Sequence, residues 1–275
     1  MKIVFFGNTR HSLIGLKILH SELNVSFIVT IDGSPTQNFA RENSIPFIIT
    51  KRFTPETTKQ IKTLGTDFFV VEDYGLILPE DLLDIPKVAA LNVHHSLLPK
   101  YRGASPAPSA ILAGEKVTGV SIIKMTDKVD AGDILEQKEY PISSEDTTDT
   151  ILTALNKIGG KLVTEVIKNY EEYEKKAKKQ DESEVTFTQF MKKEDGKIDL
   201  DSPPTAEILD RMIRAYFPWP GVWTKTIVNN KLSIIKFLPE KRIQVEGKKP
   251  ISYKDFLNGY PKLQPELVGL LEKLE

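Results

Sequence analysis

Short apolar runs alternate with amphipathic stretches along the first part of the chain, and this alternation constrains the fold more than any other feature. The apolar run Lys2–Phe6 closes at Gly7. Ser12–Leu23 then carries leucine and isoleucine at helical spacing, and a second apolar run follows at Val25–Ile31. A strand, a helix and a second strand in this order predict a βαβ unit with a right-handed crossover. We therefore expect an α/β fold with a mostly parallel sheet flanked by helices.

The same alternation continues downstream. Asp67–Val71 is almost continuously apolar, which predicts a central strand. The strand expected at 134–140 follows a link too short for a crossover helix, so it should pair antiparallel with the strand at 118–125. The other expected elements are helices at 35–43, 55–64, 107–113 and 148–170, and strands at 47–50 and 88–94.

The last part of the chain predicts a small β-rich C-terminal domain. Strands at 223–228 and 231–238 flank Asn229-Asn230, a pair that favours a hairpin turn. Glu171–Glu184 is dense in Lys and Glu, which indicates a solvated helix end and linker. We therefore expect a large domain at 1–184, a linker at 185–204, and a truncated barrel-like domain at 205–275. Its other elements would be a strand at 243–246 and helices at 206–216, 253–257 and 265–274.

The composition excludes several classes of protein. The 275 residues include no cysteine, so disulfides, thiolate metal sites and a cysteine nucleophile are ruled out. A net charge of −1 argues against a protein held to nucleic acid mainly by phosphate neutralisation, although residues 200–275 carry twelve Lys or Arg against nine Asp or Glu. No apolar run is long enough to span a bilayer, and Met1–Gly7 is too short for a signal peptide core, so we expect a cytoplasmic protein.

The stretch LNVHHSLLPKYRGASP, from Leu91 to Pro106, carries the strongest chemical signal. Asn92 and His94 are two residues apart, so on an extended strand their side chains share one face. Pro99 cannot continue a central strand, which places the polar pair at a strand terminus. In open α/β sheets, ligands bind at that edge. An isolated Asn-x-His is weak evidence, because such a pair is more often a capped turn with a satisfied histidine.

The string NVHHSLLPKYRG, followed by VDAGD at Val129–Asp133, resembles the folate-dependent formyltransferases, and among them the methionyl-tRNA formyltransferases most. The resemblance spans about Met1 to Ile142 and resumes near Val185. It implies a Rossmann-like formyltransferase core at 1–184 that binds 10-formyltetrahydrofolate as cosubstrate, and no metal.

The resemblance implies that Asn92, His94 and Asp130 are the catalytic residues. The acceptor amine would attack the formyl carbon, and the carbonyl oxygen would become an oxyanion. Asn92 and His94 would donate hydrogen bonds to that oxygen. Asp130 would orient the imidazole, favour its charged form, and accept the proton that the amine loses, directly or through water.

The resemblance also implies binding residues, each with a simpler alternative. The loop Tyr74–Pro79 would line the pterin pocket, or it would begin a helix packed into the core. Gly7, Asn8 and Thr9 would cover the amine substrate, or they would form only a tight turn. Arg102 would meet a phosphate or carboxylate of the substrate, or it would pair with a local acid. The residues expected to hold the folate are Leu76, Ile77, Leu78, Ser96, Leu97, Leu98 and Pro99.

Two residues depart from the family pattern. His95 stands where relatives usually carry glycine or proline, and Asp73 stands where a small residue is expected. His95 points to the other face of an extended chain than His94, so we expect it to pack or to face solvent. His94, His95 and Asp130 could bind a metal on residue type alone, but adjacent histidines rarely converge on one ion.

The acceptor amine is suggested by strings near the expected domain junction. KEDGKID at Lys193–Asp199, Arg214-Ala215 and PWPG at Pro218–Gly221 are typical of methionyl-tRNA formyltransferases and favour initiator Met-tRNA. Two features argue otherwise: Ile31–Phe39 lacks the basic residues of the family's tRNA-binding insertion, and only residues 222–275 follow PWPG. An amino-sugar nucleotide is the alternative acceptor. The intact Asn92, His94 and Asp130 disfavour a folate-binding module without catalysis.

Overall fold

The structure is a computed structural model that describes residues 1–260 and 262–274. The chain divides into two compact units that are interleaved along the sequence. The first contains Met1–Pro106, Val117–Pro141 and Leu152–Thr188, and the second contains Ala107–Lys116, Ile142–Ile151 and Gln189–Glu275. The division at 1–184, 185–204 and 205–275 stays a prediction.

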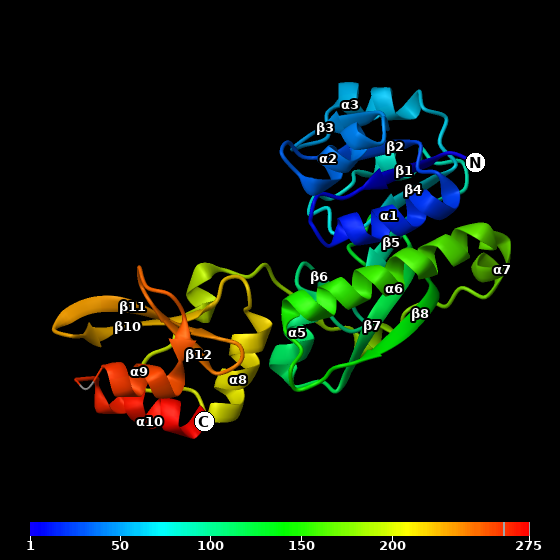
Figure 1. Ribbon diagram of the computed structural model, residues 1–275. Helices are drawn as coiled ribbons and strands as arrows, with labels where there is room; N and C mark the ends of the chain where they lie inside the picture. Colours follow the sequence, from blue (N-terminus) through cyan, green and yellow to red (C-terminus); the bar gives the residue numbers. More distant parts are fainter. Residues whose placement is uncertain (261, 275) are drawn as a thin grey trace. The chain divides into compact units, whose positions relative to one another are not determined.

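A seven-stranded sheet forms the centre of the first unit, in the order β3-β2-β1-β4-β5-β7-β8 (Figure 1). The first five strands in this order are parallel, and β7 and β8 are antiparallel to their neighbours. This confirms the expected α/β class and the antiparallel pair around VDAGD. The strands are β1 (Ile3–Phe6), β2 (Phe27–Thr30), β3 (Phe47–Ile49), β4 (Phe68–Val71), β5 (Ala89–His94), β7 (Val117–Lys124) and β8 (Ile134–Pro141).

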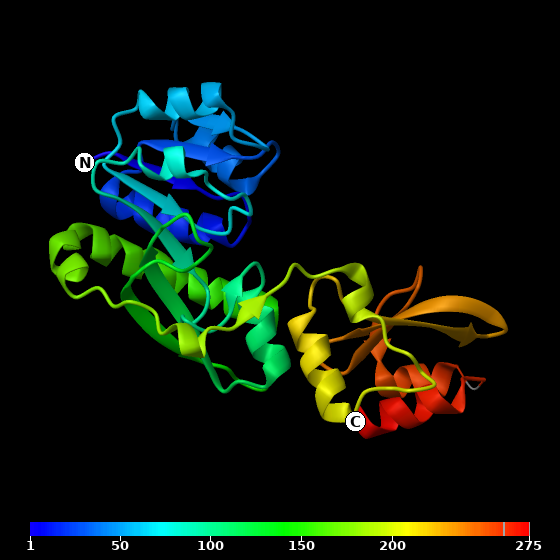
Figure 2. The ribbon, with the colours of Figure 1, turned by 180° about the vertical axis from the view of Figure 1, so that it is seen from behind.

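Helices cover both faces of this sheet. On one face, α1 and α6 pack closely, because a Cβ on Gly160 of α6 would lie 2.8 Å from the Cα of Gly15 in α1 (Figure 1, and from behind in Figure 2). On the other face, Ile61 of α3 and Leu82 of α4 join a core cluster with Phe6 and Phe69. The helices are α1 (Ser12–Leu23), α2 (Pro35–Glu42), α3 (Pro55–Lys62), α4 (Glu80–Leu83), α6 (Thr148–Lys168) and α7 (Tyr170–Lys175).

The strand order reverses between β1 and β4. The chain moves outward from β1 through β2 to β3 on one side, and from β4 to β5 on the other. Such a reversal opens a crevice outside the carboxyl ends of the two central strands, where ligands bind in sheets of this kind. Residues that directly follow Phe6 and Val71 therefore border a natural binding position.

The second unit carries a four-stranded antiparallel sheet in the order β10-β11-β12-β13. Its hairpin register pairs Val228 with Lys231 across Asn229 and Asn230, whose φ angles of 49° and 65° are left-handed, as the expected two-residue turn requires. Helices α8, α9 and α10 accompany the sheet. The elements are β10 (Val222–Val228), β11 (Lys231–Leu238), β12 (Arg242–Val245), β13 (Ile251–Ser252), α8 (Ala206–Ala215), α9 (Tyr253–Gly259) and α10 (Pro265–Leu274).

Short elements complete the chain. β6 pairs in parallel with β9, two segments that are far apart in sequence. Within residues 1–260 and 262–274, no helix has both the length and the apolar character needed to cross a membrane. The remaining elements are β6 (Arg102–Gly103), α5 (Pro106–Ala113), β9 (Phe187–Thr188) and the 3-10 turns η1 (Glu182–Glu184) and η2 (Lys193–Gly196).

Candidate active site

β5 delivers two polar side chains to the carboxyl edge of the sheet. Leu91 and Val93 are buried, and Asn92 and His94 alternate with them and so share the opposite face of the strand. β5 pairs with β4 on one side and with β7 on the other, so its position is fixed along its length. The sequence expectation for this strand is confirmed to its last residue, His94.

Asp130 completes a polar group with these two residues. Its Oδ1 accepts a hydrogen bond of 2.9 Å from Nδ2 of Asn92, and its Oδ2 accepts one of 2.8 Å from the backbone N–H of Gly103. The Nδ1 atom of His94 lies 3.5 Å from the same Oδ2. The structure thus brings together the three residues expected to be catalytic, from two distant segments of the chain. Their catalytic role stays a prediction.

The glycine of the VDAGD string explains how Asp130 reaches β5. A Cβ at Gly132 would lie only 1.7 Å from the carbonyl oxygen of Lys124, so no other residue fits without moving the backbone. The backbone N–H of Lys124 in turn donates to the carbonyl of Asp133 at 3.0 Å. The close return of the chain at Gly132 therefore sets the position of Asp130.

The imidazole of His94 contacts an oxygen on each side. Its Nε2 lies 3.0 Å from the carbonyl oxygen of Tyr101, opposite the contact with Asp130. Burial lowers the pKa of His94, and this effect exceeds the upward effects of Asp130 and Tyr101. Asp130 thus favours the charged form as expected, but the net shift goes the other way. Because a neutral ring has one N–H, it can donate to only one of these two oxygens.

Arg102 is buried and bound within the protein. Its Nη2 lies 2.8 Å from Oε1 of Glu182, and its Nε donates to Oε1 of Gln180 at 2.9 Å. The geometry matches the alternative in which the arginine pairs with a local acid. The expected contact with a substrate anion stays a prediction. It would require the ion pair between Arg102 and Glu182 to break.

Sequence reasoning missed a set of residues in the segment 178–188 that hold the loops containing Asp130 and Tyr101. Nε2 of Gln180 donates to the carbonyl oxygens of Asp130 and Gly132, both at 2.8 Å. Oγ1 of Thr186 accepts from the backbone N–H of Tyr101 at 2.8 Å. The Lys- and Glu-rich composition hides these roles. The alternation of apolar and polar residues at 185–188 is the one sequence signal for a short strand here.

The residues expected to hold the folate lie in different surroundings. Leu78 is buried in the core cluster with Phe6 and Phe69, Leu76 packs against that cluster, and Ile77 is 77% exposed. In the second stretch, Ser96 and Leu98 are buried, whereas Leu97 and Pro99 are partly exposed. Their role toward folate stays a prediction.

The Gly7-Asn8-Thr9 segment forms a closed turn at the end of β1. Nδ2 of Asn8 donates to the carbonyl of Tyr74 at 2.6 Å, which ties the turn to the end of β4. The carbonyl of Gly7 accepts from Oγ1 of Thr36 at 2.8 Å. The turn therefore lies at the reversal of strand order. Its expected contact with the amine substrate stays a prediction.

The two departures from the family pattern are partners. His95 is buried, and its Nδ1 lies 3.1 Å from Oδ1 of Asp73, while its Nε2 lies 3.7 Å from Oε1 of Glu72. Burial alone would lower the pKa of His95, but Asp73 and Glu72 raise it to about 10. Burial raises the pKa of Glu72 to about 7. His95 is packed in the interior, which is one of the two outcomes expected for it. It lies there as a cation between two carboxyl groups.

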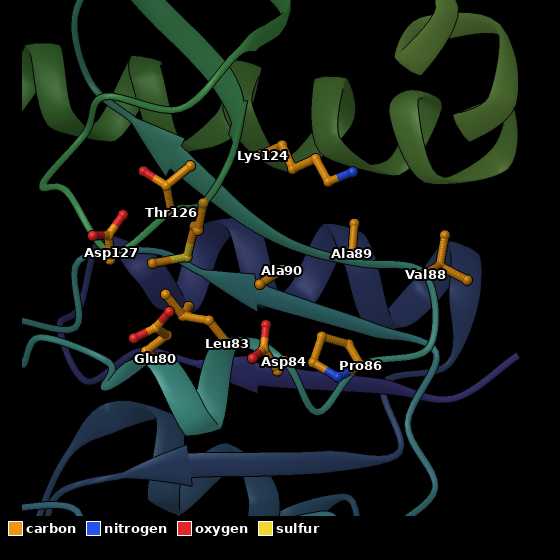
Figure 3. A pocket seen from close by; sticks show the side chains of 11 residues that line it. Glu80, Leu83, Asp84, Pro86, Val88, Ala89, Ala90, Lys124, Thr126 and Asp127 are labelled. Carbon is orange, nitrogen blue, oxygen red and sulfur yellow. The ribbon is translucent and has the colours of Figure 1, made fainter.

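A cavity of about 360 Å³ lies beside β5 in the first unit. Figure 3 shows Ala89 and Ala90 of β5 on one wall, Glu80 and Asp84 from α4 and its end on another, and Thr126 and Asp127 on the segment that continues to Asp130. None of the seven residues expected to hold the folate lines it. Within the described residues, no group of three or more His, Cys, Asp or Glu is arranged to hold a metal ion.

Two family models match separate parts of the chain. Residues 26–167 match the model described as formyl transferase, and residues 191–243 match the model described as formyl transferase, C-terminal domain. Two relatives are methionyl-tRNA formyltransferases. The one from Koribacter versatilis is 32% identical over 98% of this chain and 99% of its own. The one from Bartonella tribocorum is 37% identical over 76% of this chain and 67% of its own.

A solved structure shares the fold. The N-formyltransferase from Helicobacter canadensis, in complex with folinic acid and dTDP-3-aminofucose, superposes with a TM-score of 0.63 over 89% of this chain and 95% of its own. The two sequences are 19% identical, so the likeness concerns the fold alone.

Proposed function

Since this chain belongs to the formyl transferase family, we propose that it transfers a formyl group from 10-formyltetrahydrofolate to the methionyl amine of initiator Met-tRNA. The observation that carries this proposal is the meeting of Asn92, His94 and Asp130 at the carboxyl end of β5. The relatives that match almost the whole chain support the choice of acceptor.

The reaction needs three things from these side chains. As the amine nitrogen bonds to the formyl carbon, the carbonyl oxygen gains negative charge, and the second N–H of the Asn92 amide can donate to it. An N–H of His94 can add a second hydrogen bond once its contact with Tyr101 opens. Asp130 accepts the proton lost by the amine. The bond from the carbon to N10 of the folate then breaks, and N10 leaves with the proton that Asp130 received, transferred directly or through water.

We place the pterin ring in the cavity beside β5. The cavity volume of about 360 Å³ falls within the range of small-molecule sites. Ala90 borders it, and Asn92 and His94 follow on the same face of the strand. The carboxylates of Glu80, Asp84 and Asp127 offer acceptors for the ring N–H groups.

Filling this cavity tests the folate position. Ala90→Leu should raise the KM for 10-formyltetrahydrofolate at least tenfold, because the added methyl groups occupy the space of the ring. The KM for the acceptor should stay within twofold. Thermal unfolding of the variant checks that it folds. A folded Ala90→Leu protein with the wild-type KM for folate would refute this position.

The acceptor is tested by direct competition. Transfer of labelled formyl groups to charged initiator tRNA and to a dTDP-linked amino sugar would be measured side by side. We expect Met-tRNA to be formylated, with a rate that falls as salt concentration rises. Asp130→Asn should lose most of that rate, while Glu42→Gln, which neutralises an exposed carboxylate on α2, should not. Formylation of the sugar nucleotide alone would reject Met-tRNA as acceptor.

Such a reaction belongs to translation initiation, so we assign the protein to the cytoplasm. Any tRNA contact must also avoid the usual basic insertion, because Asp32 and Gly33 form only a short turn before Ser34 caps α2. The basic residues needed to bind tRNA therefore have to come from other segments.

A further inference from the structure

The crevice at the reversal of strand order holds a carboxylate that the proposed mechanism does not use. Asp73 follows β4, directly across from the turn Gly7–Thr9 at the end of β1. Its Oδ2 accepts a hydrogen bond from Oγ1 of Thr9 at 3.4 Å, and its side chain keeps 22% exposure. Asp73 also has a left-handed φ of 46°, so the chain turns sharply there. This backbone turn sets a negative charge at a ligand-binding edge.

His95 fixes the direction of this carboxylate. The Nδ1 of His95 holds Oδ1 of Asp73 at 3.1 Å, which leaves Oδ2 with Thr9 at the edge of the crevice. Burial opposes ionisation of Asp73, but His95 lowers the pKa of Asp73 below its usual value. Asp73 therefore presents a permanent negative charge at neutral pH.

The site is built into the core. Glu72 is 1% exposed and packs so closely against α1 that a Cβ at Gly15 would lie 1.9 Å from its Oε2. Among the described residues, Oε1 of Glu72 and Nε2 of His95 have no hydrogen-bond partner, and they lie 3.7 Å apart. A buried ionic group with unfilled hydrogen bonds is costly to keep. Its location at the crevice suggests that it serves a ligand.

We propose that Asp73 accepts a hydrogen bond from the primary amine of the acceptor, and that His95 is the positioning residue that holds Asp73 for this contact. This proposal rests on the proposed function and names the acceptor side of the same site. The folate cavity and Asn92 lie on one face of the sheet, whereas Glu72 points to the α1 face.

The negative charge of Asp73 favours an amine over a phosphate beside the turn Gly7–Thr9. A helix N-terminus such as that of α1 attracts anions. At this N-terminus, however, Thr9 and Ser12 form hydrogen bonds with each other. The N–H of Ser12 donates to Oγ1 of Thr9 at 2.9 Å, and the N–H of Thr9 donates to Oγ of Ser12 at 3.1 Å. Asp73 adds repulsion of any phosphate. An acceptor must therefore place a cation or hydrogen-bond donor at this point.

Steady-state kinetics on the full-length protein test the contact. Asp73→Asn keeps the size of the side chain and tolerates a left-handed φ, so the variant should fold. We expect its KM for the acceptor to rise about tenfold, with kcat and the KM for folate within twofold of wild type. His95→Gln should move the same KM in the same direction. Glu42→Gln on α2 is the matched loss of an exposed carboxylate and should change neither KM.

A binding measurement separates this proposal from the identity of the acceptor. Calorimetry with a stable analogue, adenosine carrying methionine in a 3′-amide bond, should give about tenfold weaker binding to Asp73→Asn than to wild type. Saturable binding with equal affinities for wild type and Asp73→Asn would overturn the role of Asp73, whereas no saturable binding to wild type would reject the methionyl acceptor. If wild type formylates only the amino-sugar nucleotide, Met-tRNA is rejected as acceptor. The amine contact is then tested by the KM of Asp73→Asn for that sugar nucleotide, which should again rise about tenfold.

Discussion

At the scale of single residues, His94 is the side chain whose surroundings bear most on the proposed mechanism. It is buried, it touches Asp130 and Tyr101, and burial lowers its pKa, so it is neutral at physiological pH. A neutral imidazole can give its one N–H to the developing oxyanion without carrying a charge into the core. Its contact with the carbonyl of Tyr101 has to open for this step.

His94→Ala should therefore lower kcat by about 10²–10³-fold, which is the typical cost of removing one oxyanion donor. The KM for folate should stay near the wild-type value, because the cavity beside Ala90 lacks this side chain among its lining residues. Single-turnover kinetics with saturating folate measure the chemical step. A variant that turns over at near wild-type rate would remove His94 from the mechanism.

The meeting of Asn92, His94 and Asp130 could be predicted because these residues lie in short strings with a recognisable order. The partners of the two unusual residues could not. Nothing in the sequence indicates that Asp73 and His95 would meet, because the contact depends on the left-handed turn at Asp73 after β4. The alternation of side chains along an extended strand correctly placed His95 on the opposite face from His94. It could not show whether that face is exposed to solvent or contains a buried ion pair.

At the scale of elements, the segment 178–188 acts on the active site from a distance. Lys178 bridges to Ile134, Gln180 binds the Asp130 loop, and β9 pairs with β6. The contacts of Gln180 and of β9 hold backbone at Asp130 itself and at Gly103, whose N–H donates to Asp130. The segment thus positions the catalytic loops although it contributes no side chain expected to touch substrate.

Gln180→Glu tests this role, because it replaces only the amide NH₂ by oxygen. The two hydrogen bonds to the carbonyls of Asp130 and Gly132 would be lost, and repulsion between oxygens would replace them. We expect kcat to fall about tenfold or more, since each lost hydrogen bond typically costs about 1 kcal/mol. Glu182→Gln, which leaves the carbonyl contacts in place, should have a smaller effect. Equal kcat values for wild type and Gln180→Glu would contradict the positioning role.

Local patterns predicted most elements well. Ser12–Leu23 is a helix with the expected ends, and the short VDAGD link forced the antiparallel pair β7 and β8. Glu171–Glu184 shows where such reasoning stops. Its charges gave the helix end correctly, since α7 runs from Tyr170 to Lys175, but the docking of Gln180 depends on tertiary contacts that composition does not encode.

At the scale of the whole molecule, the order of strands explains why the chemistry gathers at one edge. The turn after β1, the turn after β4 and the end of β5 all lie at carboxyl ends of neighbouring parallel strands. β5 borders two kinds of surroundings. Its first residues, Ala89 and Ala90, line the cavity, and the residue after the strand, His95, enters the ionic group at the carboxyl edge.

That ionic group should make the stability of the protein depend on pH. Glu72 and His95 have folded-state pKa values of about 7 and about 10, above their ordinary values of 4.5 and 6.5. The folded state therefore binds protons more tightly than the unfolded state at both groups, and their contribution to stability is lost as pH rises. The loss runs from pH 4.5 to about 7 for Glu72, and from pH 6.5 to about 10 for His95.

We expect the midpoint of urea unfolding to be lower at pH 9 than at pH 6. Amide exchange in β4 and β5 reports the unfolding of the first unit. Neutral replacement of both groups, in Glu72→Gln/His95→Gln, should make the midpoint depend less on pH over this range. Asp73 and His11, which interact electrostatically with this group, remain in both proteins, although both lose their interaction with His95 in the double variant. A wild-type midpoint that is constant or rises from pH 6 to pH 9 would show that His95 is not held as a cation.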